Sequence, residues 1–185
     1  YKNQNDEKKA LEYYLKSLEL LRKTDKSKWI ASSLSNIGSI YQSKGEVDKA
    51  MKCFDESLEL RTKIEDKYGI ATVLNNIGNL NLKLGKLKQS IQNFEESLRL
   101  RYEIEDKDGV AVSLISLSQA YLEMNNLEKA KNYGLESMKL SKELGYPKDI
   151  KNAAKILGQI YGKLDDGKNA LEMFILYDQM KDSLN

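Results

Sequence analysis

Apolar side chains recur along this chain at intervals of three and four residues, which is the spacing of one face of an α-helix. Long windows carry them at positions i, i+3, i+4 and i+7, and proline occurs only once, at Pro147. No segment alternates apolar and polar residues in the way that a half-buried strand does. The pattern therefore predicts an all-α protein.

The helical pattern repeats every 40 residues. One position of each copy carries a small residue: Ala10, Ala50, Ser90, Ala130 and Ala170. An aromatic residue follows four positions later in four of the copies: Tyr14, Phe54, Phe94 and Phe174. A fixed period in the range of about 20 to 50 residues is typical of a solenoid, whose units bury their apolar faces only against their neighbours.

Each copy has the pattern of a helical hairpin. The first complete copy predicts one helix from about Trp29 to Ser43 and a second from about Val47 to Ile64, with Gly45 as a left-handed cap between them. Turns at 66–69 and 106–109 separate the copies, and the Asp that opens each turn is suited to cap the next helix. We expect nine helices in a right-handed superhelical solenoid. It forms a single array over residues 1–185, with a truncated repeat at 1–24 and complete repeats at 29–65, 69–105, 109–145 and 149–185.

Glycines occupy one position of the first helix in three copies, at Gly38, Gly78 and Gly158. A residue without a side chain allows the second helix of the hairpin to approach closely. We expect the helix that bears Ala50, Ser90 or Ala170 to make this approach, with Phe54 or Phe94 filling the space beside the contact.

Charge gives little indication of a nucleic-acid or membrane partner. Lys and Arg number 30 against 28 Asp and Glu, and both signs are scattered along the predicted helices. A nucleic-acid-binding surface needs clustered basic residues, so we expect no nucleic-acid partner. No stretch approaches the roughly 18 uncharged apolar residues of a membrane span, so we expect no direct membrane insertion by this segment.

The residue types argue against catalysis. Histidine is absent, and the single cysteine, Cys53, stands beside Phe54 as a small core residue would. Residues 162–169 resemble a phosphate-binding P-loop, but Asn169 stands where that motif needs Ser or Thr for magnesium. We therefore expect no catalytic residue, metal or cofactor in this chain.

The repeated residues resemble the tetratricopeptide repeat (TPR) family. The resemblance rests on Leu34, Ile37, Gly38, Tyr41, Ala50 and Phe54, recurs from Leu74 to Phe94, and is looser from Leu114 and from Ala154. The period of 40 exceeds the roughly 34 residues of the common TPR, and it resembles the longer repeats of kinesin light chains. Leu34 stands where the common TPR often has Trp. The strings at 69–78 and 170–184 also look like TPR regions of Bacteroidota sensor kinases and related signalling regulators.

The two ends of the array carry apolar residues that a polar cap would lack. Tyr1 aligns with Tyr41, so the chain is expected to begin in the last turn of a helix. The apolar residues of the two terminal helices are then expected to face neighbours beyond the array: Leu11, Tyr14, Leu15, Leu18, Phe174, Ile175, Tyr177, Met180 and Leu184. The alternative is that these side chains pack within the chain. A homodimer through the open ends is a further possibility that this pattern leaves open.

The family resemblance implies that the first helix of each repeat lines a concave groove. By position, this selects thirteen candidate residues for peptide binding: Ser35, Asn36, Ser39, Asn75, Asn76, Asn79, Lys83, Val112, Ile115, Gln119, Asn152, Lys155 and Gln159. Neutral amides offer both a donor and an acceptor to a peptide backbone. The alternative is that they are solvated polar residues of an exposed helix face. Val112 and Ser116 stand where the chaperone-tail-binding TPRs have basic residues, which argues against that ligand.

These observations predict a noncatalytic module that binds a protein or peptide segment in its groove, within a larger bacterial signal transducer. Two alternatives remain. The array could serve as a self-associating scaffold, or as the regulatory region of an enzyme, such as a histidine kinase, whose catalytic domain lies outside this chain.

Overall fold

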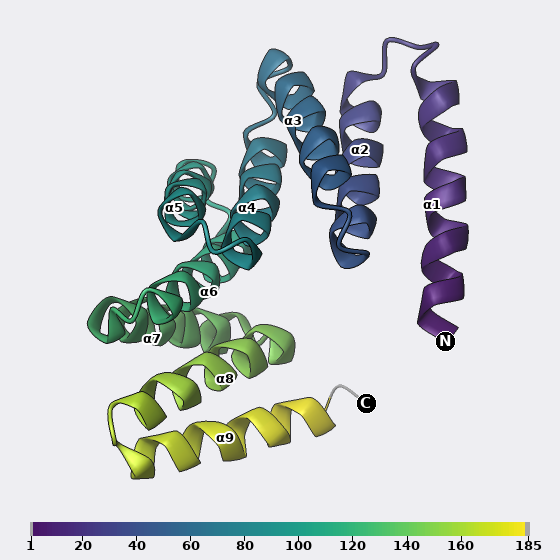
Figure 1. The fold of residues 1–185 in the computed structure, drawn as a ribbon. Coiled ribbons are helices and arrows are strands. Elements are labelled where there is room, and N and C mark those ends of the chain that lie inside the picture. The colour runs from purple at the N-terminus through teal and green to yellow at the C-terminus, as the bar shows by residue number, and fades with distance from the viewer. Residues whose placement is uncertain (1, 184–185) are drawn as a thin grey trace.

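The computed structural model describes the backbone of residues 2–183 and the side chains of residues 8–183. Nine α-helices make up this part of the chain: α1 (Lys2–Leu21), α2 (Ser27–Ser43), α3 (Val47–Lys63), α4 (Lys67–Lys83), α5 (Leu87–Glu103), α6 (Lys107–Glu123), α7 (Leu127–Leu144), α8 (Pro147–Lys163) and α9 (Gly167–Asp182). The predicted all-α solenoid is confirmed, and α1 is the helix without a hairpin partner (Figure 1). The expectation for Tyr1 lies outside the described residues.

Four helical hairpins stack side by side and form a curved array. The most extensive contacts join α2 to α3, α4 to α5, α6 to α7 and α8 to α9, and the second helix of each hairpin then packs on the first helix of the next. The first helices also contact one another, α2 with α4, α4 with α6 and α6 with α8. This closer spacing bends the array toward α2, α4, α6 and α8, which therefore line its inner face (Figure 1).

Residues with positive φ lie at the turns that follow α2 to α8. Gly45 has φ +75° and Gly85 +70°, whereas Asn125 and Asp165 take the same backbone conformation in the later hairpins. The Gly45 amide donates to Gln42 O at 3.2 Å and the Glu46 amide to Tyr41 O at 2.9 Å, which is the Schellman pattern of a helix end. The predicted left-handed cap at Gly45 is confirmed.

The predicted helix caps between hairpins are also present. Asp66 Oδ1 accepts a hydrogen bond from the Gly69 amide at 3.1 Å, and Asp106 Oδ1 accepts one from the Gly109 amide at the same distance. These bonds satisfy an amide that the first helical turn leaves without a partner. They begin α4 and α6 at a defined residue and so fix where each inner helix enters the array.

The glycines of the inner helices face aromatic rings. A Cβ atom built on Gly38 would lie 2.7 Å from Phe54 Cε1, and one on Gly78 would lie 2.5 Å from Phe94 Cε1. Both rings are fully buried. The predicted close approach of the second helix is confirmed, and the ring of its aromatic residue fills the space over the glycine.

In α3, α5 and α7, a serine of the outer helix donates a hydrogen bond to the inner helix of the same hairpin. The hydroxyls of Ser57, Ser97 and Ser137 donate to the carbonyls of Ala31, Ala71 and Ala111 at 2.8, 2.8 and 3.0 Å. All three serines are buried. The bond recurs at the same period as the hydrophobic pattern, and the sequence analysis did not anticipate it.

At each end of the array, some of the apolar residues pack within the chain and others are exposed. Leu11, Tyr14 and Leu18 pack against Ile30, Leu34 and Ile37 of α2, so they do not face a missing neighbour. Tyr177 likewise packs in the cluster of Met138 and Leu157. Phe174 and Ile175 remain 43% and 49% exposed, and Leu15 is also exposed. Leu184 lies outside the described residues.

Candidate binding site on the inner helices

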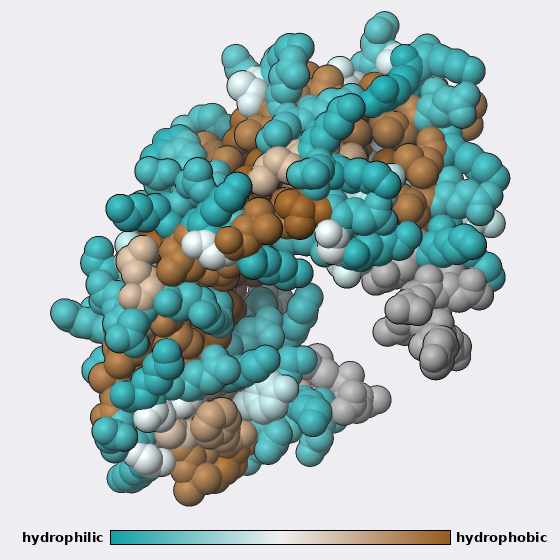
Figure 2. Space-filling view, viewed as in Figure 1, coloured by the Kyte–Doolittle hydropathy of each residue, from teal (hydrophilic) through white to brown (hydrophobic). Residues whose placement is uncertain are grey.

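A hollow of about 700 Å³ lies among α4, α6 and α8 on the inner face, and we call it the central hollow. It is lined by Asn79, Ile115, Ser116, Gln119, Leu122, Glu123, Asn152, Lys155, Ile156, Gln159, Gly162 and Lys163. Figure 2 shows the array curving around an open space. Six of the candidate residues named from the sequence therefore meet in one place: Asn79, Ile115, Gln119, Asn152, Lys155 and Gln159.

The α8 wall of the central hollow is polar. Asn152, Lys155, Gln159 and Lys163 follow one another at spacings of three and four residues, so they project from one face of the helix. The opposite wall, on α6, mixes polar and apolar groups. Gln119 Nε2 donates to Glu123 Oε1 at 2.7 Å, which already provides one partner for that carboxylate.

The floor of the central hollow is apolar. Leu122 and Ile156 are 4% and 6% exposed, and Ile115 is half-buried between them and the polar rim. An apolar ligand side chain that enters here would exchange water for contacts with these three residues. Amide groups at the rim and an apolar floor are the usual composition of a ligand pocket.

A second, shallower hollow of about 310 Å³ adjoins the first along α2 and α4. It is lined by Ser39, Gln42, Ser43, Asn79, Leu82 and Lys83. Asn79 belongs to both hollows, so a ligand that extends along the inner face could contact both. Ser39 and Lys83 are the candidate residues that this hollow adds.

Five candidate residues do not line either hollow. Ser35 is buried between helices, where its hydroxyl donates to Ala31 O at 3.1 Å and lies 2.8 Å from Ser57 Oγ. Asn75 is also buried, and its Oδ1 has no hydrogen-bond partner. Both side chains are buried, and neither lines a hollow. Asn36 is exposed, whereas Asn76 and Val112 are half-buried.

Six lining residues of the central hollow are not among the thirteen candidates: Ser116, Leu122, Glu123, Ile156, Gly162 and Lys163. A signal existed for Glu123, because it lies 40 residues after Lys83 and 40 before Lys163 and so occupies the same repeat position. Ile156 belongs to the hydrophobic core, and its buried side chain also forms the floor of the central hollow.

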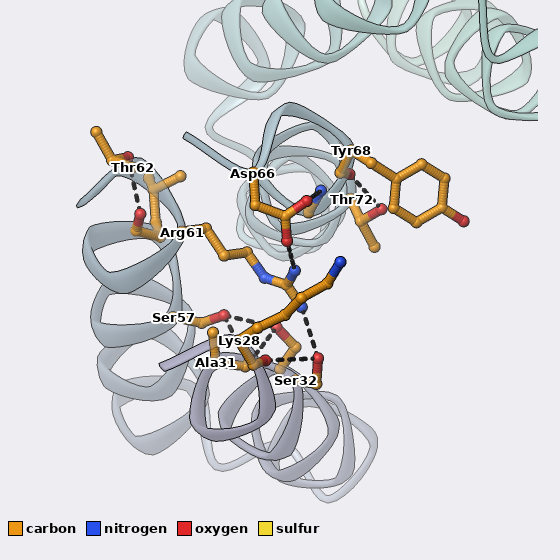
Figure 3. A network of polar contacts seen from close by, with 12 residues as sticks. Lys28, Ala31, Ser32, Ser57, Arg61, Thr62, Asp66, Tyr68 and Thr72 are labelled. Carbon is orange, nitrogen blue, oxygen red and sulfur yellow. Dashed lines mark hydrogen bonds and ion pairs between the residues drawn. The ribbon is translucent and has the colours of Figure 1, made fainter. Parts of the chain in front are cut away.

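A buried polar network joins neighbouring hairpins beside the inner face. Arg61 Nη1 donates to Asp66 Oδ2 at 2.5 Å, and Arg61 Nη2 donates to Ser32 Oγ at 3.1 Å (Figure 3). The network recurs 40 residues later, where Arg101 Nη1 donates to Asp106 Oδ2 at 2.5 Å. Both copies of the network have the same sequence pattern, in which Asp follows Arg by five residues and Gly follows Asp by three. The pattern was not among the predictions from the sequence.

The part of the chain that the structure describes offers little for catalysis or metal binding. It contains no group of three or more His, Cys, Asp or Glu side chains that could hold a metal. Burial raises the pKa of the Cys53 thiol, which disfavours the nucleophilic thiolate. None of the helices described here has the length and apolar character needed to cross a bilayer.

Comparison with known proteins agrees with this architecture. The sequence profile of the tetratricopeptide repeat matches residues 1–63, 29–103 and 69–143 in overlapping windows. No curated protein sequence matches the chain significantly.

Among solved structures, BtubC (BKLC) from P. vanneervenii superposes with a TM-score of 0.84 at 18% identity, over 100% of this chain and 76% of that one. A STAND signal transduction ATPase with a tetratricopeptide repeat sensor, from Pyrococcus horikoshii, gives 0.77 at 18% identity, over 97% and 30%. A Rap protein complexed with competence and sporulation factor gives 0.72 at 15% identity, over 94% and 58%. At these identities the likeness shows the fold alone.

The repeat profile, the stacked hairpins and the solved relatives agree on one fold, which is that of a protein–protein interaction module. The chain belongs to the tetratricopeptide repeat family.

Proposed function

We propose that this chain is a noncatalytic binding module that holds a peptide segment in the central hollow. The observation that carries the proposal is that polar residues from α4, α6 and α8 surround an apolar floor in one hollow. Three helices from three different repeats contribute to it, so the site depends on the curvature of the array. A single hairpin would present only one of these walls.

The lining supports recognition of a peptide backbone. Asn79, Gln119, Asn152 and Gln159 each carry a side-chain amide, and an amide can donate to a carbonyl and accept from an N–H group. Such contacts do not depend on the ligand's side chains, whereas the floor at Leu122 and Ile156 favours one apolar side chain. Binding would therefore combine backbone hydrogen bonds with a single apolar anchor.

We further propose that the module acts within a bacterial signal transducer. Support comes from the relatives with this fold, of which one is a STAND protein whose repeat region is a sensor and another is a Rap protein complexed with a signalling factor. In that role, occupation of the inner face would be the input, and an output region would lie elsewhere in the transducer.

A self-associating scaffold is the second candidate function, and the exposure of α9 favours it. Phe174 is 43% exposed, whereas Phe54 and Phe94 at the same repeat position are fully buried. Leu171 and Ile175 beside it are 62% and 49% exposed. A second copy that covered these side chains would remove apolar surface from water.

The peptide-binding proposal can be tested with a displayed library of random peptides. Peptides selected on the wild-type protein are titrated against the double variant Asn79→Ala and Gln119→Ala, and each lost hydrogen bond should cost roughly 1 kcal/mol of binding free energy. Gln92→Ala with Asn132→Ala, two exposed amides on the outer helices α5 and α7, is the matched control. Peptides that bind the two double variants equally would place recognition outside the central hollow and contradict the proposal.

A further inference from the structure

The central hollow has one cationic wall. Lys155 and Lys163 line it from α8, and both are exposed. Neither has an ion-pair partner among residues 8–183. The single acidic lining residue, Glu123, lies on the α6 wall and accepts a hydrogen bond from Gln119. Two lysines thus face a hollow whose one carboxylate is already partnered by a neutral amide.

The spacing of these lysines matches an extended peptide. Lys155, Gln159 and Lys163 are four residues apart along α8, and four helical residues rise by about 6 Å. Two residues of an extended chain advance by about 6.6 Å, and side chains two residues apart point to the same side. Every second side chain of an extended ligand would therefore meet a successive turn of α8.

The alternate side chains of the extended ligand, which do not face α8, would point to the opposite wall. On that side, half-buried Ile115 of α6 adjoins the floor formed by Leu122 and Ile156. The two walls thus favour different residue types, acidic toward α8 and apolar toward α6. Acidic ligand residues that pair with the lysines of α8, and an apolar ligand residue that contacts α6, together define the ligand's sequence pattern.

We infer that the central hollow selects an extended peptide segment with two acidic residues four positions apart and an apolar residue next to one of them. This inference rests on the proposed function. The two carboxylates pair with the Lys155 and Lys163 ammonium groups, the residue midway between them lies against Gln159, and the apolar side chain enters between Ile115 and Leu122.

The experiment is a selection of displayed random peptides on the wild-type protein, followed by affinity measurements on single variants. Hollow-dependent peptides, defined as those weakened by Asn79→Ala with Gln119→Ala, should be enriched in acidic pairs at the predicted spacing. Lys155→Gln and Lys163→Gln should each weaken them about two- to fivefold, as expected for exposed ion pairs. Lys142→Gln, an exposed lysine on the outer helix α7, should leave the affinity unchanged.

Two synthetic peptides of identical composition sharpen the comparison. One carries its two glutamates four positions apart, and the other carries them side by side. The first should bind more tightly, and added salt should reduce the difference because it screens the charges. Thermal melts of the lysine variants should match the wild type, since both side chains are exposed.

The outcomes separate the two proposals. Hollow-dependent peptides that lack the acidic pair, or that bind both lysine variants as tightly as the wild type, would overturn this inference and leave peptide binding intact. A selection that yields no peptide dependent on Asn79 and Gln119 would overturn both.

Discussion

Arg61 and Asp66 form a buried ion pair that joins the end of α3 to the start of α4, with 2.5 Å between Nη1 and Oδ2. The two side chains are only 9% and 12% exposed. The same carboxylate caps α4 through the Gly69 amide. A Cβ atom on Gly69 would lie 1.8 Å from Arg61 Nη1, so a larger residue at this position would displace the guanidinium. This pair therefore ties the last turn of α3 to the first turn of α4, which belongs to the next hairpin.

Asp66→Asn should lower the free energy of unfolding by about 3 kcal/mol, as measured by urea denaturation. The substitution leaves the Arg61 charge buried without a counter-ion, and breaking one side of a buried pair is strongly destabilising. Asparagine still accepts the hydrogen bond that caps α4, so the loss of the cap contributes little.

Asp166→Asn is the matched control for this effect. Asp166 caps α9 through the Asn169 amide, but Tyr161 stands where the arginine would be. This variant should change stability by only a few tenths of a kcal/mol, since asparagine is as good a cap as aspartate. An equal loss at both positions would mean that the ion pair contributes nothing beyond the cap.

Gly78→Ala should destabilise the protein by about 1 to 3 kcal/mol, because its methyl group overlaps the Phe94 ring and overpacks the core. The larger Gly78→Leu should cost more. Gly162→Ala, in a helix with no atom within 4 Å of the new methyl group, should instead stabilise by about 0.5 to 1 kcal/mol. Thermal or urea unfolding measures both, and unfolding curves that coincide would show that the contact with Phe94 is not tight.

Asp149→Asn should raise stability at neutral pH. Burial raises the pKa of Asp149 above its ordinary 3.8, and nearby Asp108 raises it further, while Lys148 opposes the shift. The folded state therefore holds the proton more tightly than the unfolded state. The protonated carboxyl therefore stabilises the folded state below the ordinary pKa. This stability is lost as the pH rises through the pKa that Asp149 has in the folded state. The stability difference between Asp149→Asn and the wild type should therefore vanish at acidic pH.

Urea denaturation at neutral and acidic pH measures the difference between the Asp149→Asn variant and the wild type. Asp48→Asn is the control, because Asp48 also lies in a first helical turn but is exposed. That control should lose a few tenths of a kcal/mol through the helix dipole. A variant at position 149 that is less stable than the wild type at neutral pH would contradict the prediction.

Ile175→Glu should reduce any concentration-dependent association of this chain, as followed by light scattering. Its side chain is half-exposed on α9 beside Phe174 and Leu171, and a charge there opposes burial against a second copy. Leu135→Glu is the control, since Leu135 occupies the same repeat position on α7 and is 43% exposed. Association that is unaffected by Ile175→Glu, or equally affected by both variants, would argue against contact through α9.

Much of the fold could be predicted from the sequence because its signals are local. The 40-residue period, the positive φ at Gly45 and the cap at Asp66 each depend on residues within a few positions of one another. Helix periodicity and turn chemistry act over that distance, so they are visible without any tertiary contact. The Arg61 network was also encoded at a fixed spacing, but burial decides whether such a pair is structural, and burial is not local.

The candidate site could be predicted only in part. Sequence position identified the inner helices and six residues of the central hollow, yet it also included Ser35 and Asn75, which are buried, and omitted Ile156, which forms the floor. The chain by itself determined which helices repeat and where they turn. Which polar side chains reach the inner face was decided by how each helix rotates and packs against two neighbours. A rotation of one residue turns a side chain by about 100° and moves it from a core contact to an open surface.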